Sequence, residues 1–431
     1  MRPTVRRRNS RLIALAVGSL LLAVILMAKY HARSDTASLQ IIGHALSSPA
    51  GTDSTVYMNM GEAAFRTPGH RIFSDLFFKE HQKFIYPPSS LFLTEMLALG
   101  SHLNVSSQAG LGAILLLGWS GTLVLAVLLY RTQRGAVTLV DGACIVLLGV
   151  IFLPLAEGLY RGQVQVVLTC LWGLAVLLWS KSRHGWAGAV LALTCAFKPQ
   201  MGLFLIWGIL RREWRFTWIF FATLTAIEVV SVVHFGWRNS LDYLAVLNYI
   251  SHHGEALWAN QSVNGVMNRV LGNGDAMSWN PTVYPPYRTA VYFVSTAFSL
   301  IAVLTGLFIP WRGGWPATTA DFLFFGGVAT IASPIVWEHH YSIFFFLLIY
   351  LLAFSERLTQ VRWVVLVGCA LAMANRLPPL DHHLRGLSSL IGAYLFLAGI
   401  AILTLVAVEM RDRRTEDPSF GVQADESLLN A

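Results

Sequence analysis

Several polar segments of the sequence carry residue types that could do chemistry, and each lies inside or beside a long apolar run. Ionisable side chains in such surroundings are costly, so they mark functional sites by default. A carboxylate accompanied by cations and amides could bind and activate a charged substrate. The segments are "GTDSTVY" with Asp53, "FIYPP" with Tyr86, "EGLYRGQ" with Arg161 and Gln163, "FKPQ" with Lys198, "NQSVNGVMNR" with Asn260, Gln261 and Arg269, and "SPIVWEHHY" with His339 and His340.

The chemistry that these residue types favour is a reaction at a membrane surface. Asp53 could take a proton from an attacking hydroxyl group. A phosphate leaving group could be held by charge-assisted hydrogen bonds. A lipid-phosphate substrate would explain why the site lies against the bilayer. The candidates for this phosphate contact are Arg161, Lys198, Arg269, His339 and His340.

Each segment also has an ordinary structural explanation when it is taken alone. Asp53 in "TDST" could cap a helix, Lys198 could reach to the interface, and the histidine pair could lie at a helix start. A metal is the main rival for "EHH", but adjacent histidines on a helix diverge by about 100°, and HExxH is absent. We therefore predict substrate or phosphate contacts, no metal ion and no cofactor.

The elements that position these segments are membrane helices. The 431 residues are 55% hydrophobic and 13% charged, with a mean hydropathy of +0.57. Apolar runs of about 18 residues or more recur along the chain, and each is a candidate span. The sequence predicts an all-α polytopic membrane protein of about 11 to 13 spans. The expected helices lie near 12–30, 109–130, 136–156, 163–180, 216–236, 288–310, 317–334, 338–354, 361–376 and 386–408, with shorter pieces at 185–197 and 199–210.

Basic residues in the short loops predict the orientation. Lys and Arg cluster at 2–8, 131–134, 181–184, 211–215 and 411–414. Such loops face the cytoplasm, which places both termini inside and all the polar segments on the outer face. This arrangement requires 86–104 to be a re-entrant or interfacial helix rather than a crossing. If 86–104 does cross, one of the pieces beside Lys198-Pro199 must not.

The domain organisation expected from these patterns is simple. Residues 1–410 form one membrane domain. Two long outer loops interrupt it: 31–108, which contains Asp53 and the short membrane-associated helix, and 237–287. The polar segment 411–431 is expected to be a disordered cytoplasmic tail.

The order of the motifs resembles that of glycosyltransferase family 87, over roughly residues 45–345. The motifs are an outward Asp in the first loop, "YPP", "RGQ", "FKP", "NQS…G…R" and "SPIVWEHHY". That family belongs to the GT-C superfamily of membrane glycosyltransferases and contains bacterial mannosyltransferases that use polyprenyl-phosphate-mannose. The acid Glu338 departs from relatives that often carry Asp or a small polar residue, and no motif matches after residue 360.

The resemblance implies a GT-C type bundle and a reaction. Asp53 would deprotonate an acceptor hydroxyl, which attacks the anomeric carbon with inversion. The donor would be a polyprenyl-phosphate sugar, with mannose, arabinose or another sugar as the group moved, and the acceptor a glycolipid or glycan. His339 or His340 would bind donor phosphate or acceptor, with Lys198, Arg161 and Gln163 beside them. The protein would lie in a bacterial plasma membrane with its site facing outward.

Two other classes of function remain as alternatives. A transporter or flippase of lipid-linked sugars would line a path open to both faces, whereas the acids and amides here gather on one face. A purely structural membrane scaffold gives no reason for Lys198, Arg161 and the histidine pair.

Overall fold

The computed structural model describes residues 9–30, 38–47, 51, 53–66, 71–100, 106–309, 317–377 and 386–416. Within these ranges every regular element is a helix, and the one β-type pairing is an isolated bridge between Asn260 and Trp337. The predicted all-α class is therefore confirmed.

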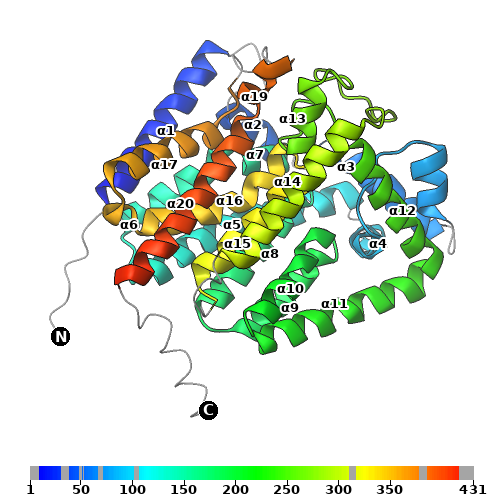
Figure 1. The fold of residues 1–431 in the computed structure, drawn as a ribbon. Coiled ribbons are helices and arrows are strands. Elements are labelled where there is room, and N and C mark those ends of the chain that lie inside the picture. The colour runs from blue at the N-terminus through cyan, green and yellow to red at the C-terminus, as the bar shows by residue number, and fades with distance from the viewer. Residues whose placement is uncertain are drawn as a thin grey trace.

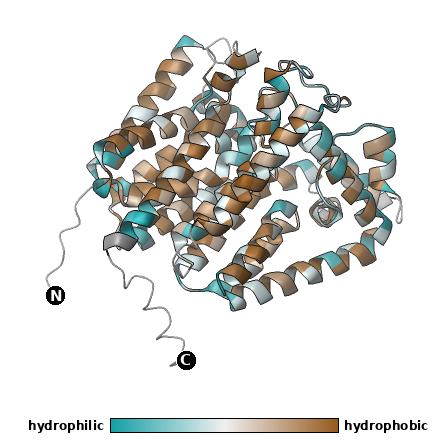
Figure 2. Cartoon of the chain, in the orientation of Figure 1, coloured by the Kyte–Doolittle hydropathy of each residue, from teal (hydrophilic) through white to brown (hydrophobic). Residues whose placement is uncertain are grey.

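Five helices are long and apolar enough to cross a membrane, and a bent pair would make a sixth. Figure 2 shows hydrophobic residues along most of the length of these helices and hydrophilic ones at helix ends and in loops. The chain is thus an integral, multi-pass membrane protein. The five are α1 (Ser10–Lys29), α5 (Ser107–Arg134), α11 (Trp214–Phe235), α14 (Thr289–Phe308) and α20 (Tyr394–Glu416), and the pair is α6 (Leu139–Val150) with α7 (Leu153–Tyr160).

Most of the other predicted spans are shorter helices, so fewer elements than the predicted 11 to 13 qualify by length. A helix of 16 residues such as α8 rises only about 24 Å, less than a hydrocarbon core of about 30 Å. Loops or 3₁₀ turns adjoin these helices and interrupt the apolar runs. They are α8 (Gln165–Ser180), α9 (His184–Cys195), α10 (Leu203–Leu210), α15 (Thr319–Ile331), α16 (Phe344–Ala353) and α17 (Gln360–Ala374).

Proline causes two of the interruptions. Pro154 lies in the first turn of α7, where its ring cannot continue α6, and the two helices meet at 53°. The predicted break at Lys198-Pro199 is confirmed: α9 ends at Cys195, and Pro199 begins the 3₁₀ helix η4 (Pro199–Gly202) before α10.

Basic side chains gather at one end of the bundle. Arg11 donates to the carbonyl of Leu358 (2.9 Å), and Arg134 pairs with Glu356 (3.0 Å). At the same end, α1 begins and α20 ends, at the lower left of Figure 1, whereas α13 (Val263–Val270) and α19 (Ser389–Gly392) lie at the top. We call this the basic end.

The pieces flanking Lys198 run away from the basic end and back to it. His184, which begins α9, pairs with Glu213 just after α10 (2.9 Å). Helix α4 (Leu91–Gly100) has ten residues, about 15 Å, which is too short to cross. Both observations fit the predicted arrangement in which 86–104 is not a span.

Residues 338–353, which the sequence predicts as a membrane span, lie at the centre of the protein and are covered by other helices. The 3₁₀ helix η5 (Glu338–Ile343) leads directly into α16, and every residue of both is buried. Glycines on neighbouring helices make room for the phenylalanines: Phe345 packs on Gly149 and Phe346 on Gly173. The polar residues of η5 therefore point into protein.

The two predicted outer loops contain helices of their own. The first holds α2 (Ser38–Ser47), α3 (Ser54–Arg66), the π-helix η1 (Phe73–Lys79), η2 (Pro88–Ser90) and α4; the second holds α12 (Trp237–His253) and α13. Residues of α3, η1 and α12 share an apolar core of their own. At the other end of the chain, α20 includes 411–416, so the predicted disordered tail is helical there, and 417–431 lies outside the described residues.

Candidate active site

A cavity of about 1440 Å³ lies at the end of the bundle opposite the basic end. It is enclosed by helices α3 and α12 of the two predicted outer loops, by the "RGQ" and "FKP" segments, and by η5. Its lining, as far as the structure describes the chain, includes no residue of the basic end. Seven of the predicted site residues line it: Asp53, Tyr86, Arg161, Gln163, Lys198, His339 and His340.

Asp53 is held at the wall of this cavity by the end of α7. A side chain at Gly51 would come within 2.1 Å of the carbonyl oxygen of Tyr160, so only glycine allows this close approach. As a result Gln163 Nε2 donates to Asp53 Oδ2 (3.1 Å), and Arg161 Nη1 lies 3.7 Å from the same oxygen. The Asp53 side chain is 36% exposed and can meet a substrate.

Tyr86 extends this polar contact. Its hydroxyl donates to Gln163 Oε1 (3.4 Å), and its ring packs edge-on against Tyr57. Burial raises the pKa of Tyr86 above its ordinary value, and the negative charge of Asp53 raises it further. The phenol therefore stays protonated and orients the Gln163 amide toward Asp53.

Behind this wall, two acids and two arginines alternate. Arg161 binds Glu157, which also pairs with Arg376 (3.2 Å), and Arg376 pairs with Glu338 (3.1 Å). All but Arg161 are almost fully buried. Buried charges persist when they are paired in this way. The network joins α7, η5 and the chain after α17, and it holds the Arg161 side chain near Asp53.

Neither Arg376 nor a role for Glu157 was predicted from the sequence. Both lie at the outward end of an apolar run. That position was a usable signal, but the pairing of Arg376 with two acids depends on residues far away in the chain.

Lys198 and His339 supply hydrogen-bonding groups to the cavity and form no ion pair with an acid within the described residues. Lys198 has no ion-pair partner among the residues that the structure describes, and it lines the same cavity as His339. His339 Nε2 is buried with no hydrogen-bond partner in the described chain. The neighbouring His340, in contrast, forms a hydrogen bond with the backbone of Ile335. A bound anion would satisfy His339 and Lys198 together.

The remaining three predicted residues do not line the cavity. Asn260 accepts from the Val336 amide (2.9 Å), and Gln261 donates to the carbonyls of Trp258 and Gly392 (3.0 Å each). Arg269 donates to the carbonyl of Asn260 (2.9 Å). These bonds brace the loop before α13 against the segment before η5. Within the described residues, no group of three or more His, Cys, Asp and Glu side chains could hold a metal ion.

The fold and the site together define a multi-pass membrane protein with a cavity at one end whose largely apolar lining carries several polar side chains. The model of glycosyltransferase family 87 matches residues 84–334, which is more than half of the chain. The chain belongs to this family and is a membrane glycosyltransferase, so it uses a sugar donor and an acceptor. No curated protein matches the chain. The matched range includes seven of the predicted site residues, whereas Asp53 lies 31 residues before it and the histidine pair begins five residues after it.

Proposed function

We propose that the protein transfers a monosaccharide, mannose or another hexose, from a polyprenyl-phosphate-sugar donor to a lipid- or polymer-linked acceptor. The observation that carries the proposal is the placement of Asp53: a carboxylate fixed by Gln163 at the wall of a cavity whose other polar groups include Lys198 and His339. A base and a phosphate-binding group are the two parts that this reaction needs.

In the proposed reaction Asp53 accepts the proton of an acceptor hydroxyl. The oxygen attacks the anomeric carbon from the side opposite the phosphate, and the bond from that carbon to the phosphate oxygen breaks. The configuration at the carbon inverts. Lys198, Arg161 and His339 stabilise the charge of the departing polyprenyl phosphate. Gln163 orients the Asp53 carboxylate for this proton transfer, and Arg161 lies 3.7 Å from the same oxygen.

The apolar part of the cavity lining supports a lipid-linked donor. One part of its lining is formed by membrane helices rather than by polar loops, and it is mostly apolar. An isoprenoid tail could lie along this part while its phosphate reaches Lys198. The residues of this part are Leu203 on α10 and Thr296, Ser299, Leu300 and Val303 on α14.

The outward orientation of the site is also part of the proposal. The basic end would face the cytoplasm, which places the cavity at the extracytoplasmic face of a bacterial plasma membrane. A flippase would be expected to line a path between both ends, and this lining includes no residue of the basic end within the described chain.

The test is an assay of the purified protein with a panel of polyprenyl-phosphate sugars and, in parallel, the matching nucleotide sugars. Mass analysis of the lipid products identifies the sugar moved. We expect product from at least one lipid-linked donor and none from nucleotide sugars. Product from a nucleotide sugar alone, or movement of lipid-linked sugar across the bilayer without bond formation, would contradict the proposal.

His339→Ala is expected to weaken donor binding. Losing one hydrogen bond to a charged phosphate costs about 1.5–3 kcal/mol, which corresponds to a rise of roughly 10- to 100-fold in donor KM. Initial rates at varied donor concentration measure it. His234→Ala, which removes an exposed histidine paired with Glu95 outside the cavity lining, is the control. An unchanged donor KM in His339→Ala would remove this residue from the phosphate site.

A further inference from the structure

The cavity has a second group of functional side chains that the proposed transfer step does not use. Both long outer segments contribute to it, and so does the loop before η5. It combines one ion pair with several large aromatic rings. We call it the aromatic subsite and define it by Lys83, Glu255, Trp258, Trp279, Tyr284 and Trp337, all of which line the cavity.

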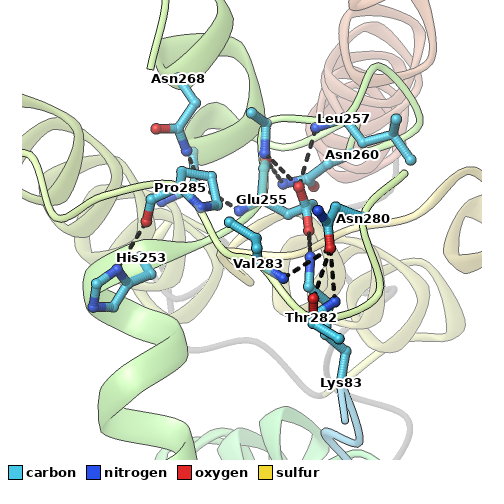
Figure 3. Close-up of polar contacts among 12 residues, drawn as sticks. Lys83, His253, Glu255, Leu257, Asn260, Asn268, Asn280, Thr282, Val283 and Pro285 are labelled. Atoms are coloured by element: carbon cyan, nitrogen blue, oxygen red, sulfur yellow. Dashed lines mark hydrogen bonds and ion pairs between the residues drawn. The ribbon is translucent and has the colours of Figure 1, made fainter. Parts of the chain in front are cut away.

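The polar centre of the aromatic subsite is the pair formed by Lys83 and Glu255. Their charged atoms are 2.6 Å apart, and the side chains are only 6% and 7% exposed. Glu255 Oε1 also accepts from the amide of Ala256 (2.9 Å). Figure 3 shows Lys83 reaching Glu255 from a distant part of the chain. An almost buried pair in this position presents fixed donors and acceptors to a neutral polar ligand.

Glu255 is placed by the turn that ends α12. Gly254 has a positive φ of +65°, and a side chain there would come within 1.7 Å of Asn264 Oδ1. That oxygen instead accepts from the Glu255 amide (3.2 Å). Glycine is therefore required for the chain to turn Glu255 toward Lys83.

Aromatic rings surround the pair. The Lys83 ammonium lies 4.3 Å from the ring centroid of Trp279 and 4.4 Å from that of Tyr284. Trp337 packs edge-on against Trp279. Although it makes these contacts, Trp279 remains 48% exposed, which leaves ring surface available at the cavity.

The loop that carries Trp279 is held in place by its own polar contacts. Asn280 Oδ1 accepts from the amides of Thr282 (2.9 Å) and Val283 (3.1 Å), and His253 bonds the carbonyl of Pro285 (2.8 Å), as Figure 3 shows. A ring on a braced loop loses little conformational freedom when it binds a ligand.

The aromatic subsite adjoins the groups around Asp53. Trp258 lies over the guanidinium of Arg376 (4.7 Å), which pairs with Glu338, and Trp337 is the residue before Glu338. A ligand on these rings would therefore lie within the same cavity as the proposed base.

Resting on the proposed function, we infer that the aromatic subsite binds the acceptor through a pyranose ring. The C–H face of a pyranose is flat and weakly positive, so it stacks on the negative face of an indole. Its hydroxyl groups would meet Glu255 and Lys83. A polyprenyl chain needs no such ion pair, and a phosphate would be repelled by Glu255, so the subsite suits a neutral sugar better than either part of the donor.

The experiment titrates the purified full-length protein in lipid nanodiscs with methyl glucoside, mannoside and galactoside pyranosides, and with a methyl furanoside. No donor is present. Saturation-transfer NMR measures binding to the wild type and to Trp279→Ala, Trp279→Phe, Glu255→Gln and Trp186→Ala. Trp186 is 67% exposed and does not line the cavity, so it is the matched control for loss of an exposed tryptophan.

We expect at least one pyranoside to bind more tightly than the furanoside. Trp279→Ala should weaken this binding about tenfold, the worth of one aromatic stacking contact of about 1.5 kcal/mol. Trp279→Phe should keep most of it, Glu255→Gln should weaken it, and Trp186→Ala should not change it. Thermal unfolding of each variant shows that the protein remains folded.

Two outcomes would overturn the inference: no pyranoside binding to the wild type, or equal binding to the wild type and Trp279→Ala. Because the titration contains no donor, its result does not depend on the donor chemistry. Transfer from a polyprenyl-phosphate sugar with either outcome would leave the proposed function standing and remove only the aromatic subsite. Pyranoside binding without transfer from any polyprenyl-phosphate sugar would leave the aromatic subsite standing and contradict the proposed function.

Discussion

Asp53→Asn is expected to lower kcat for sugar transfer by about a hundred- to ten-thousand-fold, which is the contribution of a positioned general base. The change should be local. Asparagine can still accept the hydrogen bond from Gln163 Nε2, and Arg161 keeps its bond to Glu157. Expression and donor binding should therefore persist while turnover is lost.

The measurement is single-turnover transfer in nanodiscs with a radiolabelled polyprenyl-phosphate sugar. Asp242→Asn is the matched control, because Asp242 is an acid of the outer helices that pairs with Arg71 and does not line the cavity. It should transfer sugar at the wild-type rate. A turnover in Asp53→Asn equal to that of Asp242→Asn would exclude Asp53 as the base.

Arg376→Met is expected to lower the free energy of unfolding by roughly 3 to 5 kcal/mol, the usual cost of removing one partner from a buried ion pair. Arg376 bridges Glu157 and Glu338, and all three side chains are at most 4% exposed. Without Arg376, Glu157 still has Arg161, but Glu338 is left as a buried charge. Adding Glu338→Gln should therefore restore part of the lost stability.

Denaturant unfolding in detergent, followed by tryptophan fluorescence, measures these differences. Arg362→Met is the control from the same helix region: Arg362 pairs with Asp412 where the two side chains are 28% and 33% exposed. Pairs exposed to this degree contribute at most about 1 kcal/mol. Equal effects of Arg376→Met and Arg362→Met, or no recovery with Glu338→Gln, would show that the buried network does not stabilise the protein.

Local sequence patterns were sufficient for the membrane class and for several boundaries. Apolar runs predicted both ends of α1 and α11 to within two residues, and Lys198-Pro199 marked the break before α10. These features depend on hydrophobicity and on the backbone chemistry of proline, both of which act within a few residues. Span length was less predictable, because an apolar run continues through the bends that end helices such as α15.

Contacts between segments that are distant in the sequence determine which polar residues lie together. The sequence placed all the polar segments on one face, but it could not separate the residues that line the cavity from those behind its wall. Asn260 and Gln261 look as available as Gln163 in the sequence, yet they bond backbone groups that other segments bring to them.

The sequence by itself determined that this is an all-helical membrane protein with polar segments at one face, because hydrophobicity and charge are properties of single residues. The tertiary structure decided the partners: Gln163 for Asp53, Arg376 for Glu157 and Glu338, and Lys83 for Glu255. It also separated His339, whose Nε2 has no partner in the described chain, from His340, which bonds the backbone. Such pairings depend on side-chain directions in a packed interior, which no local pattern specifies.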